Sequence, residues 1–160
     1  MKIAISVQDA DHRDPGVARA IHAVQMAAYA QEAALLGARD FPPLRRTVDD
    51  IRRGAERFLV AVDEGAIVGA LGLAPDDELR TLNIDSLVVA PERQREGVGR
   101  ALVAAAIDRH AAAPLSVSTG VKNLPALALY AGFGFTESHR AFKGEDPIEV
   151  VTLRRAPSQG

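Results

Sequence analysis

The stretch 87-LVVAPERQREGVGRAL-102 joins a predicted strand to a predicted helix through a turn that contains two glycines. Its first residues are apolar and β-branched, and Pro91 ends the strand because proline cannot donate a ladder hydrogen bond. Apolar residues then recur at the three- and four-residue spacing of one helix face, namely Leu102, Val103, Ala106 and Ile107. Gly97 and Gly99 therefore lie where a strand passes into the N-terminus of a helix.

The position of these glycines suits the binding of a phosphate group. The first amides of a helix have no partner within the helix, and the helix dipole adds partial positive charge there. Three arginines would add countercharge, namely Arg93, Arg95 and Arg100. The dinucleotide fingerprint would need a glycine at Leu102, and the sequence has no Gly-Lys-Ser/Thr triplet of a P-loop, so neither loop fits. The alternative is that the glycines only let the helix pack closely against the strand.

Composition narrows the classes of protein to which the chain can belong. Its 160 residues are typical of one domain, and 48% hydrophobic with 25% charged residues is ordinary for a globular protein. The net charge of −2 gives no bulk attraction to nucleic acid or to anionic membranes. The absence of cysteine excludes disulfides, thiolate metal sites and a cysteine nucleophile. We expect a cytoplasmic protein without a metal, in which residues 1–155 form one domain and residues 156–160 a frayed tail.

Apolar periodicity and turn residues predict an α+β or α/β domain in three layers. The expected strands are residues 3–7, 57–62, 66–73, 82–89, 115–119, 133–137 and 148–153. The expected helices are residues 17–36, 48–53, 97–113 and 123–131. The turn Asp63-Glu64-Gly65 predicts a hairpin in the first half, and the later strands alternate with helices as in parallel crossovers.

A second stretch, 123-NLPALALYAGFGF-135, predicts a helix followed by a strand. Asn123 is a suitable N-cap, and Pro125 is tolerated in a first helical turn. Helical spacing places Asn123, Ala126 and Tyr130 on one face. Taken alone, the tyrosine is interpreted most simply as part of a packed core.

Together, the two stretches resemble the two signature segments of the GNAT superfamily of N-acetyltransferases. The first matches Q/R-x-x-G-x-G/A at Gln94, Gly97 and Gly99. The second matches N-x-x-A-x-x-L-Y-x-x-x-G-F from Asn123 to Phe135. The resemblance extends from about Phe58 to the last strand. It implies a mixed, mainly antiparallel central sheet of about seven strands flanked by about four helices.

The resemblance also implies acetyl-CoA as the cosubstrate. In the family, the amides of the first segment hold the pyrophosphate of coenzyme A, and the strand before it pairs with the pantetheine arm. The residues carried over by position are Val88, Val89, Gln94, Arg95, Glu96, Gly97, Val98, Gly99, Arg100, Asn123, Ala126 and Tyr130. Glu96 departs from the family, in which many members have a basic residue there, so its carboxylate must point to solvent.

Acetyl transfer to an amine needs a base for the amine proton, a donor for the carbonyl oxygen and an acid for the departing thiolate. The resemblance assigns the acid to Tyr130 and the donor to a backbone N–H near Val88. Asp85 on the central strand is the first candidate for the base, although strict alternation places it on the face of Leu87. Glu32 is the second candidate. Since the chain has no cysteine to acylate, direct transfer in a ternary complex is expected.

The acceptor side of such a site is expected to be lined by Tyr29, Glu32 and Phe41, an aromatic and acidic set that suits a small amine or amino-acid-like molecule. We therefore expect an acetyl-CoA-dependent N-acetyltransferase that acts on a primary amine. The alternative is a non-catalytic coenzyme A-binding regulatory module. We also expect a homodimer that pairs through residues 148–153, and we expect neither nucleic acid nor membrane as a partner.

Overall fold

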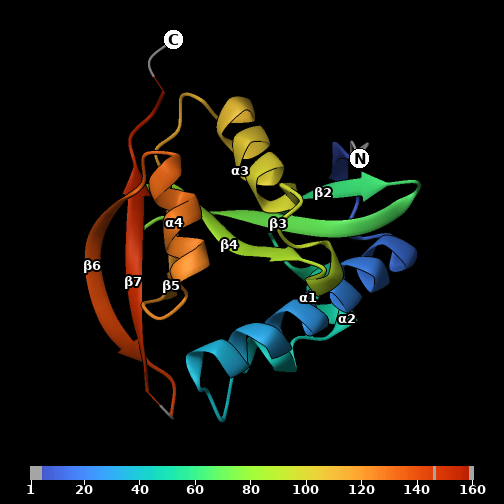
Figure 1. The fold of residues 1–160 in the computed structure, drawn as a ribbon. Helices are drawn as coiled ribbons and strands as arrows, with labels where there is room; N and C mark the ends of the chain where they lie inside the picture. The colour runs from blue at the N-terminus through green and yellow to red at the C-terminus, as the bar shows by residue number, and fades with distance from the viewer. Residues whose placement is uncertain (1–4, 146, 159–160) are drawn as a thin grey trace.

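A mixed sheet of seven strands organises the part of the chain that the computed structural model describes, residues 5–145 and 147–158 (Figure 1). The strands lie in the order β1-β2-β3-β4-β5-β7-β6. They are β1 (Ser6–Ala10), β2 (Arg57–Asp63), β3 (Ala66–Asp76), β4 (Thr81–Val89), β5 (Leu115–Gly120), β6 (Thr136–Lys143) and β7 (Ile148–Arg155). The helices are α1 (Pro15–Leu36), α2 (Val48–Arg53), α3 (Val98–Arg109) and α4 (Leu124–Gly132), with short 3-10 turns η1 (Pro42–Arg45) and η2 (Pro91–Arg93).

Helices cover both faces of the sheet, which gives three layers (Figure 1). The buried cluster on the α1 and α2 face includes Ala18, Ile21, Ile51, Phe58, Val60 and Val88. The cluster on the α3 and α4 face includes Leu71, Leu102, Val103, Val117 and Tyr130. Neighbouring strands are antiparallel except β4 and β5, so the predicted mainly antiparallel α+β fold is confirmed. Within the described ranges, no helix is long and apolar enough to cross a membrane.

Capping residues determine where the first two helices begin and end. Asp14 accepts a hydrogen bond from the Val17 N–H at 3.0 Å and begins α1, which ends at Gly37 with a φ of 67°. Thr47 and Asp50 form a reciprocal capping box that begins α2. The predicted cap at Thr47 and the predicted helix end at Gly37 are therefore confirmed.

β4 and β5 separate after a short parallel pairing. Residues 82–84 pair with residues 115–117, whereas β4 continues to Val89 and β5 to Gly120. A β-bulge lies where the strands part, because Gly72 of β3 pairs with Ser86 and the next residue of β3 pairs with Ile84. Asp85 is the extra residue of this bulge. The separation opens a gap in the sheet and leaves backbone groups of β4 without a neighbouring strand.

Several elements differ in their bounds from the predicted ones. The first strand begins at Ser6, and residues 3 and 4 of the prediction lie outside the described residues. α3 ends at Arg109, before the predicted residue 113. The strand expected at residues 133–137 begins at Thr136, because Gly134 takes a left-handed conformation with a φ of 87° after the helix.

The C-terminal part of the chain corrects two further expectations. The N–H of Ser158 donates to the carbonyl oxygen of Ala111 at 2.8 Å, so the tail is held rather than frayed as far as Ser158. β7 lies between β5 and β6 and has a hydrogen-bonded neighbour on both sides. Residues 148–153 therefore have no free edge with which to pair with a second copy, and the sheet edge on this side belongs to β6.

Candidate active site

Two hollows meet where β4 and β5 separate. The first, the loop groove, follows the turn between β4 and α3 and is lined by Val88, Val89, Gln94, Arg95, Gly97, Val98, Gly99, Arg100, Asn123 and Ala126, all predicted to bind the coenzyme. The second, the tyrosine cavity, has a volume of about 350 Å³ and is lined by Tyr29, Glu32, Phe41, Asp85 and Tyr130, all predicted site residues. Glu32, Leu87, Asn123 and Ala126 line both hollows, so the two adjoin there.

The N-terminus of α3 presents free amides to the loop groove. The first hydrogen bond within the helix runs from the Ala101 N–H to the Gly97 carbonyl oxygen at 3.0 Å. The N–H groups of Val98, Gly99 and Arg100 therefore have no partner within the helix, and all three residues line the groove. Gly97 itself has a φ of 85°, which favours glycine at this place in the turn.

Gly99 is not required by the packing of α3 against the sheet. A Cβ atom built on this residue would lie 3.6 Å from both the Leu129 and the Val89 side chains, which is ordinary van der Waals contact. Its backbone is not in the left-handed region. The interpretation that the glycine only allows close packing of the helix is therefore not supported at this position.

Glu96 is the one predicted coenzyme-binding residue of the turn that does not line the loop groove. Its Oε1 accepts a hydrogen bond from Arg93 Nε at 2.8 Å, and Arg93 also donates to Asp63 Oδ2 at 2.7 Å. This pairing agrees with the expectation that the carboxylate points away from the groove. Arg93 thus forms ion pairs with two carboxylates. The Arg100 guanidinium instead lies over an aromatic ring, 5.4 Å from the centroid of Phe133.

The register of β4 determines which of its amides face the gap. The Ala90 N–H donates to the Val68 carbonyl oxygen at 2.9 Å. In an antiparallel ladder such pairs alternate, so the N–H of Val88 points to β3, and the N–H groups of Leu87 and Val89 point away from it. The donor expected near Val88 therefore belongs to one of its two neighbours. Leu87 lies where the two hollows adjoin.

Tyr130 is almost fully buried in α4, and its side chain lines the tyrosine cavity rather than the loop groove. The residue is 3% exposed, and its ring packs edge-on against Phe135 at a centroid distance of 5.4 Å. Burial raises the pKa of the hydroxyl above its ordinary value, and the nearby Glu32 and Tyr29 raise it further. The raised pKa keeps the hydroxyl protonated, and no described residue hydrogen-bonds to it, so it is free to donate to a ligand.

Glu32 is the titratable residue shared by the two hollows. Burial raises the pKa of its carboxyl above the ordinary value, and a hydrogen bond with the Asn123 side chain partly offsets that effect. Asn123 is itself fixed, because its Oδ1 accepts from the Ala126 N–H at 3.3 Å at the start of α4. Glu32 is thus a carboxylate with an elevated pKa, held from one side, at the place where the hollows adjoin.

Asp85 lines the tyrosine cavity but not the loop groove. Its Oδ1 accepts from Asn83 Nδ2 at 2.6 Å, and partial burial raises the pKa of the carboxyl despite that hydrogen bond. The bulge at Asp85 interrupts the strict alternation that was expected along β4. Ile84 and Leu87, three residues apart, both pack toward the α3 and α4 cluster.

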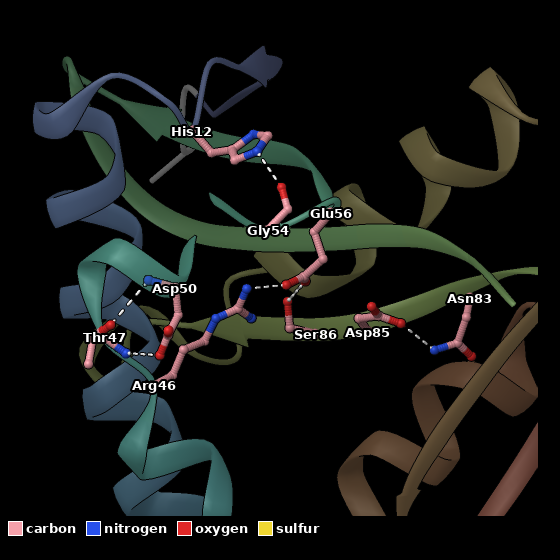
Figure 2. A network of polar contacts seen from close by, with 9 residues as sticks. All are labelled: His12, Arg46, Thr47, Asp50, Gly54, Glu56, Asn83, Asp85 and Ser86. Carbon is pink, nitrogen blue, oxygen red and sulfur yellow. Dashed lines mark hydrogen bonds and ion pairs between the residues drawn. The ribbon is translucent and has the colours of Figure 1, made fainter. Parts of the chain in front are cut away.

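A buried polar network reaches the tyrosine cavity through Ser86, which lines it (Figure 2). Glu56 forms an ion pair with Arg46 and accepts from Ser86 Oγ at 3.2 Å. Ser86 in turn hydrogen-bonds to Tyr29, and burial, the largest effect, raises the pKa of Tyr29 to about 12. A Cβ on Gly72 would collide with the Glu56 carboxylate, so glycine at that position leaves room for the network.

No pattern in the sequence indicates this network. Glu56 precedes β2 without any periodic pattern, and its partners come from a loop and from β4. The same holds for Gln31, whose Oε1 accepts from Gln94 Nε2 at 2.6 Å across the loop groove. A capping box and a glycine turn are local patterns, whereas these contacts depend on how distant segments pack.

Comparisons with known proteins assign the chain to a family. Residues 10–135 match the model of the Acetyltransferase (GNAT) family. The UPF0157 protein YqkA of Bacillus subtilis (strain 168) is 36% identical over 136 residues, which are 83% of this chain and 39% of that protein. The chain thus spans well under half the length of this curated relative.

Solved structures show the same fold at low sequence identity. The ribosomal-protein-S18-alanine N-acetyltransferase of Escherichia coli superposes with a TM-score of 0.75 at 17% identity, over 98% of this chain and 96% of that one. YncA of Salmonella typhimurium, whose structure contains acetyl-CoA, superposes with a TM-score of 0.69 at 18% identity, over 98% and 96% of the two chains. At these identities the likeness establishes the fold and not the acceptor.

Proposed function

Because the chain belongs to the Acetyltransferase (GNAT) family, we propose that it transfers an acetyl group from acetyl-CoA to a primary amine of a small molecule, directly within a ternary complex. The observation that carries the proposal is that the loop groove and the tyrosine cavity adjoin at Glu32, Leu87 and Asn123. A coenzyme in the first hollow and an amine in the second would meet there. The cavity volume of about 350 Å³ suits a small molecule.

The residues of the loop groove fit acetyl-CoA. Three free amides at the start of α3 suit the pyrophosphate, and Gly99 lines the groove beside them. Arg95 and Arg100 line the groove and add positive charge, while Arg93 compensates the carboxylate of Glu96. Where β4 leaves β5, the N–H groups of Leu87 and Val89 point into the gap and are available to an extended ligand.

Acetyl-CoA, when bound, supplies the acetyl group as a thioester, so that an ammonium group and the thioester become an amide, a thiol and one proton. Glu32 accepts a proton from the amine, and its elevated pKa suits a base that works near neutral pH. Tyr130 donates its proton to the departing sulfur and regains a proton afterwards. The N–H of Leu87 donates to the carbonyl oxygen as negative charge develops there.

The choice of Glu32 over Asp85 as the base follows from position. Asp85 lines only the tyrosine cavity, whereas Glu32 also lines the groove in which the acetyl donor is expected. Burial is the main cause of the raised pKa of Tyr130, and the charge of Glu32 adds to it, which supports a short distance between these two side chains. Glu32 thus combines a raised pKa with access to both substrates.

The decisive experiment combines coenzyme binding with amine turnover. We expect calorimetry to detect acetyl-CoA binding and a broad panel of primary amines to yield free thiol in the presence of the protein. Absence of binding at millimolar acetyl-CoA would reject the proposal. If acetyl-CoA binds but no amine releases thiol, the alternative of a non-catalytic regulatory module gains support.

A homodimer is proposed through β6 rather than β7. All eight residues of β6 are exposed, the strand forms one edge of the sheet, and Phe142 is 70% exposed. Sedimentation of the protein at micromolar concentration tests this, because a monomer there contradicts it. The cytoplasmic location expected from the sequence stays a prediction.

A further inference from the structure

Two carboxylates of the tyrosine cavity form no ion pair within the described residues. Four charged residues line the cavity, namely Glu32, Asp40, Asp85 and Lys143. Asp40 is paired with Arg45 outside the cavity, and Lys143 belongs to the exposed strand β6. Glu32 and Asp85 instead accept hydrogen bonds from neutral side chains, those of Asn123 and Asn83.

The two unpaired carboxylates occupy different parts of the cavity. Glu32 lies on α1 at the border with the loop groove. Asp85 lies on the bulge of β4, next to Ile84, the last residue of that strand to pair with β5. The buried arginine of the neighbouring network, Arg46, already forms an ion pair with Glu56. At Asp85, the charge of Glu56 raises the pKa by more than the charge of Arg46 lowers it, so this pair gives the Asp85 carboxylate no net compensation.

The cavity also contains groups that favour a polar, positively charged ligand. Tyr130 is 3% exposed and lines the cavity, and its hydroxyl has no hydrogen-bond partner among the described residues. Tyr29 and Phe41 line the same cavity, and their rings meet edge-on at a centroid distance of 6.2 Å. Aromatic faces stabilise ammonium groups and pack against methylene chains. A carboxylate on the acceptor would instead meet the unpaired charge of Asp85.

We propose that the acceptor is a small diamine, with one amine at Glu32 for acetylation and the second, as an ammonium ion, bound by Asp85. This inference rests on the proposed function and names the substrate class of its site. It narrows the amino-acid-like acceptors expected from the sequence, because Lys143 is the one cation among the described lining residues, against the carboxylates of Glu32, Asp40 and Asp85. Asp85 is then a specificity residue, and Glu32 is the catalytic base.

Matched four-carbon amines test the proposal. The probes are 1,4-diaminobutane, n-butylamine and 4-aminobutanoate, which differ only in the charge of the far end. We expect kcat/KM for thiol release to be about tenfold higher for the diamine than for n-butylamine, and lowest for 4-aminobutanoate. Chain lengths from three to six carbons, each diamine with its monoamine, make the result independent of the spacing between the carboxylates.

The Asp85→Asn variant assigns the effect to one residue. It removes the charge at constant shape, so the ratio of diamine to monoamine kcat/KM should fall from about ten to about one. Asp108→Asn removes an exposed carboxylate of α3 and should leave the ratio unchanged. A ratio that is unaltered by Asp85→Asn, or a monoamine that equals the diamine in the unmodified protein, overturns the proposal.

Binding measurements distinguish a wrong acceptor class from the absence of acetyltransferase activity. If no amine releases thiol although acetyl-CoA binds, the enzymatic function is rejected, and calorimetry with the same amines still examines the cavity. Tighter binding of 1,4-diaminobutane than of n-butylamine, abolished by Asp85→Asn, supports the diamine site. Equal binding of the two amines contradicts it.

Discussion

Arg93 donates from its Nε to Glu96 Oε1 at 2.8 Å, and this pair neutralises the only carboxylate between Gln94 and Gly99. The same guanidinium reaches Asp63 at the turn between β2 and β3, so the loop is tied to a neighbouring hairpin. A carboxylate in a segment expected to hold a pyrophosphate is thus compensated within the chain. Glu96 should therefore repel a bound pyrophosphate less than an unpaired carboxylate would.

This pairing predicts the result of a double-mutant cycle. Arg93→Ala leaves the Glu96 charge without its partner near the loop groove and should weaken acetyl-CoA binding by about three- to tenfold. Glu96→Gln in addition should restore most of that affinity, because the repulsive charge is gone. Calorimetry at low and moderate salt measures both steps. Glu92→Gln, on the exposed η2 turn, is the matched control, and additive effects of the two substitutions would contradict the coupling.

Two substitutions of Gly99 distinguish an effect on coenzyme binding from an effect on folding. Gly99→Glu should lower acetyl-CoA affinity by more than about 100-fold, because a carboxylate would stand before the free amides of α3. Gly99→Ala should fold with nearly unchanged thermal stability, since its Cβ makes only ordinary contacts. Thermal unfolding of both variants accompanies the titration. Tight binding by a folded Gly99→Glu protein would show that the coenzyme does not use these amides.

The parts of the site that could be predicted from the sequence are those that depend on residues close together in the chain. The turn at Gly97, the N-cap at Asn123 and the helix face of Tyr130 depend on residues a few positions apart, and the structure brings all of them to adjoining hollows. The face of Asp85 was not predictable by alternation, because a bulge adds one residue to β4 without a marker in the sequence.

Contacts between distant segments were not predictable either. Glu56 meets Arg46 and Ser86 only once β2, β4 and the segment before α2 have packed together. The free edge of the sheet was misplaced for the same reason. Both β6 and β7 are short strands near the C-terminus, and only their order next to β5 determines which of them is covered.

The raised pKa of Glu32 predicts where activity is lost on the acidic side of the pH–rate profile. A base acts when ionised, so kcat/KM should rise with pH through the elevated pKa of Glu32, above the ordinary glutamate value of 4.5. Glu32→Gln should lower kcat by about 100-fold or more and remove that limb. Asp40→Asn, at the rim of the same cavity, is the control. A limb that persists in Glu32→Gln would assign the titration to another group.

The same pKa shift has a consequence for stability. Since the folded pKa of Glu32 is raised above its unfolded value, the folded state binds the proton more tightly, and stability falls as pH rises from the unfolded to the folded pKa. Denaturant unfolding across this pH range should show a shallower loss in Glu32→Gln than in the unmodified protein. An identical pH dependence in both proteins would contradict the raised pKa.

Tyr130→Phe separates catalysis from packing. The hydroxyl lines the tyrosine cavity and has no hydrogen-bond partner among the described residues, so its removal should leave the stability nearly unchanged. Thiol release should fall by about 100-fold if this hydroxyl is the acid, with acetyl-CoA affinity retained. Thermal unfolding and steady-state kinetics measure the two effects. Unchanged turnover would transfer the role of acid to water.

Arg46 and Arg45 are neighbours whose ion pairs differ in burial. Arg46 pairs with Glu56, whose side chain is 8% exposed, whereas Arg45 pairs with Asp40 at the surface. Arg46→Met leaves an uncompensated carboxylate beside the tyrosine cavity and should lower the free energy of unfolding by about 3 kcal/mol. Arg45→Met should cost less than about 1 kcal/mol. Denaturant unfolding gives both values.

Restoring the balance of charge tests the cause of that loss. In Arg46→Met, a second substitution, Glu56→Gln, removes the buried charge and should recover a large part of the lost stability, because an amide costs less to bury than a carboxylate. Ser86 can still donate to the amide oxygen at the position of Glu56 Oε2. If the double variant is no more stable than Arg46→Met, the loss comes from the packing of the arginine side chain and not from the orphaned charge.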